Sequence, residues 1–205
     1  WLAAGDNAAV NPAMASLRDV LAKDLSLLTG DWAPLWVVDF PMFEHQPDAS
    51  AGEPEWLAMH HPFTAPALDD AAAVVPSETL LSQAYDLVLN GYEIAGGSVR
   101  IHQYERQLAI LNLLGLDAQK AHQALGHLLK GLQLGAPPHA GIAFGLDRLL
   151  MLMSRADSIR EVIAFPKTQS GHCPLTHAPG WLDDALLQDL GVQIHPSIKA
   201  MREQS

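Results

Sequence analysis

Cysteine is nearly absent from this sequence: Cys173 is the single one among 205 residues. One thiol excludes an internal disulfide and a thiolate metal cluster, and it fits a reducing cytoplasm. No run of about eighteen apolar residues occurs, so the sequence predicts no membrane span. Residues 1–6 lack a basic group and an initiator methionine. We therefore expect no secretory signal there and interpret the chain as part of a longer one.

Basic residues are also scarce. Twelve lysines and arginines stand against 23 acidic residues, which gives a net charge of −11, and no basic run occurs. Phosphate contacts need clustered positive charge, so this balance argues against a general nucleic-acid-binding surface. With 49% hydrophobic residues, the chain can bury a core of one domain or slightly more, and its composition favours a small-molecule enzyme.

Three motifs of common enzyme classes are missing: the P-loop, the Rossmann glycine pattern and the nucleophile elbow. Ser98 follows two glycines but has no recognisable base beside it. The sequence therefore disfavours a covalent hydrolase.

The pattern of apolar residues predicts an α+β fold. Helices are expected at 12–28 after an Asn11 cap, at 104–114, at 118–134 after an Asp117 cap, and at 182–190. Strands are expected at 35–40, 56–59, 98–102 and 162–165, a hairpin of two strands at 85–90 and 92–95, and an exposed loop at 44–55. Strands joined by a tight turn and interspersed with helices are typical of an antiparallel sheet, not of a parallel doubly wound one.

The strongest turn signal is Asn90-Gly91, which predicts a two-residue hairpin. In that hairpin Val88 pairs with Glu93 and Asp86 with Ala95. Asp86 and Glu93 then become diagonal neighbours on one face, about 7–8 Å apart at the backbone. Two carboxylates at that separation repel each other unless a cation lies between them, and the Mg²⁺ of a bound ATP would suit. From the hairpin alone, two acids on a solvated strand face are the preferred interpretation.

Arg100 follows on the second strand. Strict alternation places it on the face opposite Glu93, because their numbers differ in parity. The two can share a site only if the strand slips by one residue, so we predict a β-bulge in the segment Ala95-Gly96-Gly97. Arg100 would then offer a carboxylate two parallel donors. An exposed arginine in an ion pair is the alternative.

Two more features point to small anionic ligands. Gly141 and Gly145 precede a helix that is expected to begin near Leu146, with Arg148 in its first turn. The helix dipole favours an anion at that end, so an arginine there suggests that a ligand supplies the negative partner.

His60 and His61 precede Pro62. Adjacent histidines of an extended chain project to opposite sides and chelate a metal poorly, whereas a neutral imidazole could hydrogen-bond an amino-acid ligand. A turn capped by its own side chains is the plainer interpretation.

Five pieces of the sequence, in this order, resemble the bacterial-type aspartyl-tRNA synthetases of class II. They are WAPLWVVDFPMFE, AMHHPFTAP, AYDLVLNGYEIAGGSVRIH, GAPPHAGIAFGLDRLLML and SIREVIAFPKT. The likeness runs from Trp32 to about Pro179, and the helix expected at 12–28 resembles the end of the insertion domain of bacterial forms. It implies two domain parts, 1–30 from the insertion and 31–205 from the C-terminal part of a catalytic domain with a class II antiparallel sheet flanked by helices.

The resemblance also implies a reaction: ATP-dependent formation of aspartyl-adenylate, followed by transfer to tRNA. Arg148 is implied to stack on adenine and hold the γ-phosphate, beside the backbone of Gly145, Leu146 and Asp147. Expected partners are L-aspartate, the aspartate tRNA and, for the full-length enzyme, a second subunit, with no membrane.

For the other ligands, the resemblance implies that Asp86 and Glu93 hold Mg²⁺, with Glu93 also at ATP. Arg100 is implied to bind the side-chain carboxylate of aspartate, with His60 and His61 beside it. Catalysis of this kind depends mainly on positioning and charge stabilisation.

Some signature elements of that family have no counterpart in this sequence. These are the first motif, which builds the dimer, the second, with its arginine on the α-phosphate, and the anticodon-binding barrel. Loss of a contact such as that of the α-phosphate arginine typically costs about 10²–10³ in rate. Because these elements are missing, we expect the chain to hold only half of an active site. Two alternatives stay open: a truncated paralogue that binds ATP or an amino acid without charging tRNA, and a structural piece whose ligand residues are relics. The presence of Asp86, Glu93, Arg100 and Arg148 argues against the relic.

Overall fold

The computed structural model describes residues 2–47, 54–69, 73–196 and 198. The chain divides into two compact units, Trp1–Phe144 and Gly145–Ser205, and each is described by itself. No helix in these described ranges is long and apolar enough to cross a membrane. The domain boundary near residue 30 stays a prediction.

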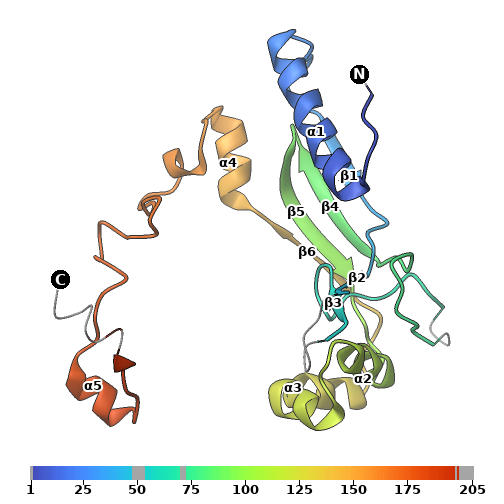
Figure 1. Cartoon of the computed structure of the whole chain (residues 1–205), viewed down its shortest axis with the longest axis vertical. Helices are drawn as coiled ribbons and strands as arrows, with labels where there is room; N and C mark the ends of the chain where they lie inside the picture. The colour runs from blue at the N-terminus through green and yellow to red at the C-terminus, as the bar shows by residue number, and fades with distance from the viewer. Residues whose placement is uncertain (1, 48–53, 70–72, 197, 199–205) are drawn as a thin grey trace. The chain divides into compact units, whose positions relative to one another are not determined.

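The first unit is built on a four-stranded antiparallel sheet, as the sequence predicts (Figure 1). The strands lie in the order β1, β4, β5, β6, and their bounds are Pro34–Val37, Ala84–Leu89, Tyr92–Val99 and Ala140–Phe144. A separate antiparallel pair joins β2 (Phe43–His45) to β3 (Trp56–Ala58). The strand expected at 56–59 is thereby confirmed. The segment expected to be a loop from residue 44 instead starts inside β2, and residues 48–53 lie outside the described part.

The turn between β4 and β5 has the conformation that its sequence predicts. Asn90 and Gly91 both have positive φ, 52° and 84°, which is the combination that matches the twist of a two-residue hairpin. The Asn90 side chain accepts a hydrogen bond from the Ala33 amide (2.8 Å) and donates one to the Asp31 carbonyl (2.8 Å). One residue therefore closes the hairpin and ties it to the segment that leads into β1.

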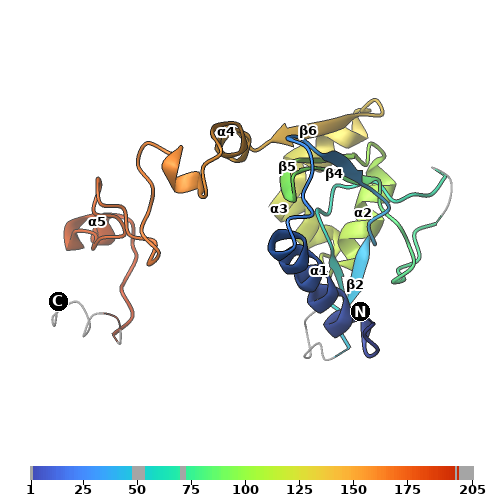
Figure 2. The same ribbon diagram turned by 90° about the horizontal axis from the view of Figure 1, so that it is seen from above.

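Two helices come after β5 in the chain, and their bounds agree closely with the expected ones. They are α2 (Tyr104–Leu113) and α3 (Ala118–Gln133), and the Asp117 carboxylate caps α3 by accepting from the Lys120 amide at 2.9 Å. Figures 1 and 2 show them side by side beyond the C-terminal end of β5. The buried apolar residues form two clusters: in one, Ile110 of α2 packs with Met42, Phe43, Ala65 and Ile101, and in the other, Leu111 of α2 packs with Ala121 and Leu129 of α3.

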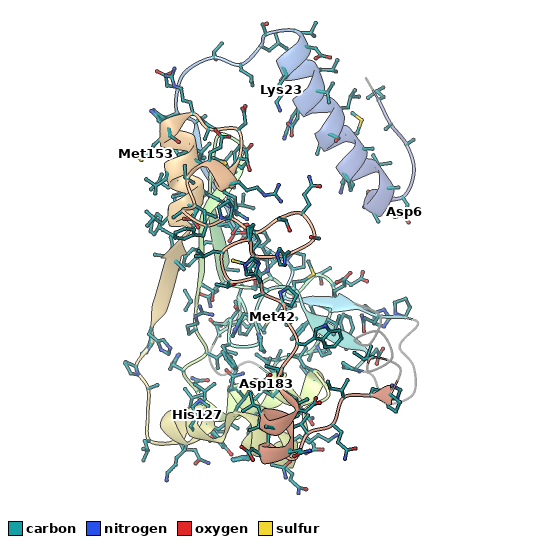
Figure 3. The ribbon with its side chains drawn as sticks, turned by 90° about the vertical axis from the view of Figure 1, so that its left-hand side faces the viewer. Asp6, Lys23, Met42, His127, Met153 and Asp183 are labelled. Carbon is teal, nitrogen blue, oxygen red and sulfur yellow. The ribbon has the colours of Figure 1, made fainter. Side chains whose placement is uncertain are left out.

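The first helix starts earlier than expected. α1 spans Asn7–Asp24, and its cap is Asp6, whose carboxylate accepts from the Ala8 amide. The Asn11 cap was wrong because Asp6 provides a cap one turn earlier, and Pro12 then lies inside the helix. The helix buries none of its side chains, which are drawn between Asp6 and Lys23 in Figure 3.

The second unit contains α4 (Leu146–Ser154), a 3-10 turn at Ile159–Glu161 and α5 (Asp184–Asp189). The starts expected for α4 and for the last helix are confirmed to within two residues. The strand expected at 162–165 is wrong. Ser158 and Glu161 form a reciprocal capping box that folds this stretch into a helical turn, and Val162 ends that turn with helical φ and ψ.

The contact between β5 and β6 generates a stability prediction. A Cβ at Gly97 would lie 2.0 Å from the Gly141 carbonyl oxygen and 2.8 Å from the Tyr85 ring. We expect Gly97→Ala to lower the free energy of unfolding by about 2–3 kcal/mol or more, because backbone must move. Urea unfolding measures this change in the free energy of unfolding. Gly131→Ala on α3, where no atom lies within 4 Å of the added Cβ, is the control and should stabilise by up to about 1 kcal/mol. Equal stabilities of the two variants would contradict the close packing.

Candidate active site

The β4–β5 hairpin brings the two predicted metal-binding carboxylates onto one face. Val88 pairs with Glu93 as expected, but Leu87 pairs with Ala95 and Asp86 with Gly96. Asp86 and Glu93 are therefore on the same face and close to each other, which confirms their predicted juxtaposition. The expected partner of Asp86, Ala95, was wrong by one residue because the bulge lies between the two pairs.

The predicted bulge exists, but at Ile94 and not in the Ala95-Gly96-Gly97 segment. Ile94 is the extra residue of β5 between the pairs of Glu93 and Ala95, and it is 6% exposed. Its buried apolar side chain anchors the extra residue, so the bulge needs no glycine. The two glycines instead allow close approach, Gly97 to β6 and Gly96 to the carboxylates.

Gly96 lies at the centre of the acidic face. A Cβ built on it would lie 2.7 Å from Asp86 Oδ1 and 3.5 Å from Glu93 Oε1. Both carboxylates thus reach toward the same small volume, which a larger residue at 96 would fill. No group of three or more His, Cys, Asp or Glu side chains gathers to bind a metal anywhere in the described ranges. A cation here would therefore take two protein carboxylates and complete its shell from other sources.

The bulge also decides where Arg100 lies. Alternation from Gly96 puts Ser98 and Arg100 on the Asp86 face, as the bulge hypothesis requires. The Arg100 amide donates to the His139 carbonyl at 2.9 Å, so the backbone is fixed just beyond the end of β5. Its side chain lines a cavity of about 350 Å³ together with Phe63 and others.

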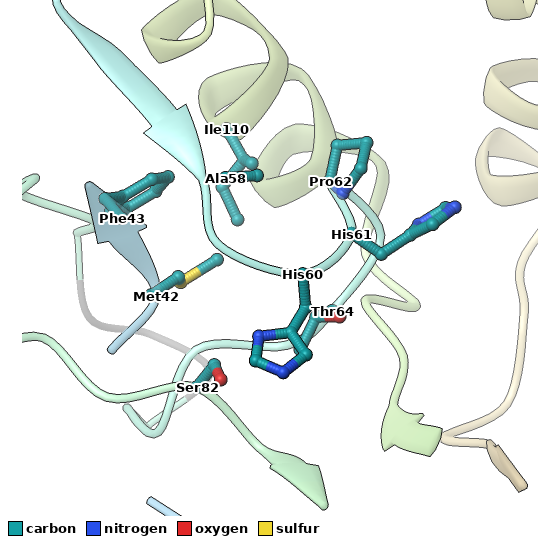
Figure 4. Close-up of a pocket in the computed structure, with 9 residues that line it drawn as sticks. All are labelled: Met42, Phe43, Ala58, His60, His61, Pro62, Thr64, Ser82 and Ile110. Carbon is teal, nitrogen blue, oxygen red and sulfur yellow. The ribbon is translucent and has the colours of Figure 1, made fainter. Parts of the chain in front are cut away.

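His60 and His61 occupy a turn and their rings point in different directions (Figure 4). The His60 ring lies over Phe40, with 4.4 Å between ring centroids, and borders a small cavity that Ser82 and His61 also line. The His61 ring packs edge-on against Phe63, with 4.5 Å between ring centroids. The two imidazoles do not form a chelating pair.

The electrostatic environment favours the neutral form of His61. Desolvation by burial, and then the positive charge of Arg100, lower the pKa of His61 below its ordinary value. The influence of Arg100 indicates that these two predicted aspartate-binding residues are near each other. His61 Nδ1 accepts a hydrogen bond from the Phe63 amide at 3.3 Å.

The predicted nucleotide-binding residues Gly145, Leu146, Asp147 and Arg148 belong to the second unit. Gly145 caps α4 and its carbonyl accepts from the Leu149 amide at 3.0 Å, so Arg148 is the third helical residue, in the first turn as predicted. All four are exposed. The structure thus brings together the acidic pair, Arg100 and His61 in the first unit, and groups the nucleotide residues separately.

Comparisons with known proteins show the family of the chain. A sequence profile of the class II tRNA synthetases (D, K and N) matches residues 8–169. The chain belongs to this family. The aspartate–tRNA(Asp/Asn) ligase of Legionella pneumophila is 51% identical over 191 residues, which are 92% of this chain and 31% of that protein. The solved aspartyl tRNA synthetase from Entamoeba histolytica matches with a TM-score of 0.50 and 25% identity, over 78% of this chain and 26% of that one. This class II synthetase chain therefore spans about a third or less of the length of these relatives.

Several residues around the candidate site were not singled out by sequence analysis. The Tyr85 hydroxyl donates to the Gly141 carbonyl at 3.0 Å, and the Thr64 hydroxyl donates to Ser98 Oγ at 3.2 Å in a buried position. Gln107 is 1% exposed and donates to the Pro62 carbonyl at 2.9 Å. Only Gln107 carries a sequence signal, because it is a polar residue one turn before the apolar Ile110 of an expected helix.

The lowered pKa of His61 predicts a pH dependence of stability. As the pH falls, the unfolded chain takes up a proton at this histidine before the folded chain does. The contribution of His61 should therefore be complete above about pH 6.5 and be lost as the pH falls through its lower folded pKa. Urea unfolding between pH 8 and 5 measures this loss, which His61→Gln should diminish.

His127→Gln removes an exposed imidazole from α3 and serves as the matched control. If His61→Gln leaves the pH dependence as steep as in the unmodified chain, the neutral state assigned to this imidazole is wrong.

Proposed function

We propose that the chain is the C-terminal catalytic part of an aspartate–tRNA ligase, which activates aspartate with ATP and transfers it to tRNA in the cytoplasm. The observation that carries the proposal is 51% identity to the Legionella pneumophila aspartate–tRNA(Asp/Asn) ligase over 92% of this chain. The acidic face of the hairpin, with Arg100 and His61 nearby, supports it. The α-carboxylate of aspartate would attack the α-phosphorus of ATP and expel pyrophosphate. A tRNA hydroxyl would then attack the activated carbonyl and expel AMP.

Asp86 and Glu93 are the residues proposed to hold Mg²⁺. They fit the ion, because their oxygens approach one point beside Gly96, where no Cβ occupies the space. Mg²⁺ commonly binds to one or two carboxylates and keeps waters and substrate phosphates as its other ligands. When bound, the ion would neutralise part of the negative charge of the phosphates. The carboxylates themselves would fix where the β- and γ-phosphates lie relative to β5.

Arg100 is proposed to bind the side-chain carboxylate of aspartate. Its guanidinium can donate two parallel hydrogen bonds to a carboxylate, a geometry that lysine lacks. A neutral His61 adds a donor without adding a second positive charge, and His60 is proposed to border the same amino acid. Arg148, next to the backbone of Gly145, Leu146 and Asp147, is proposed to stack on adenine and to bind the γ-phosphate.

Other parts of the reaction are proposed to depend on a longer polypeptide. The chain spans 31% of the length of the Legionella ligase, and its sequence has no counterpart of the α-phosphate arginine. With a net charge of −11, most contacts to tRNA are proposed to come from elsewhere, as are the contacts that form a homodimer. The sheet has β1 and β6 as its edge strands, and every residue of β6 is exposed, which leaves edges to which further strands could add.

The activity test is aspartate-dependent exchange of pyrophosphate into ATP. We expect no exchange by the 205-residue chain alone, and exchange once the upstream part of the Legionella ligase is supplied in the same mixture. Asp86→Asn should abolish the restored exchange. Exchange by the chain alone would contradict the expectation that it holds only half of the active site. No exchange in either case, with ATP or aspartate still bound, would favour the truncated paralogue.

The acidic face predicts a second outcome that does not depend on activity. We expect Gly96→Ala to weaken Mn²⁺ binding to the chain by about tenfold, because its methyl displaces the Asp86 carboxylate from the shared volume. Electron paramagnetic resonance of free Mn²⁺ measures this affinity. The methyl meets the end of a flexible side chain, so the fold should persist.

Gly141→Ala, on the adjacent strand with no atom within 4 Å of the added Cβ, is the matched control. Unchanged Mn²⁺ affinity in Gly96→Ala would show that the cation binds elsewhere.

A further inference from the structure

Two consecutive polar side chains of α2 are buried in its core face. Arg106 is 8% exposed and Gln107 is 1% exposed, whereas Ile110 and Leu111 on the next turn are fully buried apolar residues. Buried polar groups cost free energy unless they are hydrogen-bonded. Arg106 donates to the Asp69 carbonyl at 2.5 Å, and Gln107 Nε2 donates to the Pro62 carbonyl at 2.9 Å. Both therefore hold the segment that follows the histidine pair.

The Gln107 bond reaches the central peptide of a tight turn. The Thr64 amide donates to the His61 carbonyl at 3.0 Å, which makes Pro62 and Phe63 the two central residues of a β-turn. The peptide between them carries the Pro62 carbonyl and the Phe63 amide. The two main families of such turns differ by a flip of this peptide, and the bond from Gln107 opposes the flip.

The same peptide contacts the imidazole of His61. Its N–H, on Phe63, donates to His61 Nδ1 at 3.3 Å. Because the carbonyl and the N–H of a trans peptide point in opposite directions, one planar group has Gln107 on one side and His61 on the other. A donor on the carbonyl also polarises the N–H and strengthens its own hydrogen bond.

This connection selects one form of the imidazole. An Nδ1 that accepts a hydrogen bond carries no proton, so in the neutral ring the proton is on Nε2. Nε2–H is then a donor, on the far side of the ring from the turn. If the peptide flipped, a carbonyl oxygen would replace the N–H near Nδ1, and the opposite tautomer would be favoured.

We propose that Gln107 is a positioning residue of the amino-acid site: through the Pro62–Phe63 peptide it fixes His61 as the Nε2–H tautomer, a donor for the carboxylate of a small acidic amino acid. The ligand half of this statement rests on the proposed function, whereas the tautomer half does not. Gln107 touches no substrate in this scheme and acts only through the turn.

The test of the tautomer is ¹⁵N NMR of histidine-labelled chain at pH 8, with His61 assigned by its loss in His61→Gln. In the unmodified chain we expect a protonated Nε2 and an unprotonated, hydrogen-bonded Nδ1. Gln107→Met, which keeps length and volume but removes the donor, should give a mixture of tautomers. Leu111→Val weakens the packing of the same helix in its other cluster, against Ala121 and Leu129, and should leave the pattern unchanged.

Three results would overturn the proposal. They are a His61 protonated on Nδ1 in the unmodified chain, an unchanged pattern in Gln107→Met, and an equal change in Leu111→Val. The first needs no variant, so the test holds even if Gln107→Met fails to fold.

A titration with L-aspartate separates this proposal from the proposed function. We expect the His61 resonances to shift with aspartate but not with glycine, and Gln107→Met to weaken that binding by about tenfold. A changed tautomer with no aspartate response in any chain would contradict the proposed function alone. A changed tautomer with unchanged aspartate affinity would overturn the positioning role.

Discussion

The single extra residue at Ile94 determines which side chains can share a site on this sheet. Without it, Arg100 would lie on the face opposite Glu93. With it, Asp86 and Glu93 lie on one face, and alternation from Gly96 carries Arg100, just beyond the end of β5, onto the same face. The bulge is held by burial of Ile94, which is 6% exposed. A hydrophobic contact in the core therefore sets the geometry of a polar site, and loss of that contact would permit the register to slip.

Repulsion between Asp86 and Glu93 is the constraint that the rest of the face accommodates. Their oxygens converge beside Gly96, and a cation between them would relieve the repulsion of the two like charges. Gly96 and Gly97 affect different contacts. Gly96 leaves space between the two carboxylates, whereas Gly97 lets β6 approach β5 closely. Substitution of either would act through a different mechanism, on ion binding or on the sheet itself.

Local signals in the sequence predicted what local interactions decide. The Asn90-Gly91 turn, the Asp117 cap and the start of α4 each depend on a few adjacent residues, and each is found where expected. Competition between signals caused the errors: Asp6 capped α1 before Asn11 could, and the Ser158 capping box overrode the apolar run at 162–165. The position of the bulge depends on which side chain of β5 the core buries, and the Gln107 contact joins residues 45 positions apart. Single-sequence patterns encode neither. The roles of the site residues in catalysis stay predictions.

The charged side chains of the first unit would suit two ligands of different charge, a cation at the acidic pair and an anion at Arg100. The acidic pair contributes two negative charges, which match a divalent cation carried by a nucleotide. Arg100 contributes one positive charge, and the lowered pKa of His61 prevents a second from appearing beside it. A doubly positive subsite would bind many anions, including phosphates, through charge alone. On the proposed function, one guanidinium plus a neutral donor would instead demand the geometry of a carboxylate. A neutral His61 would then serve discrimination among anions, and the turn that Gln107 holds would give that ring its direction.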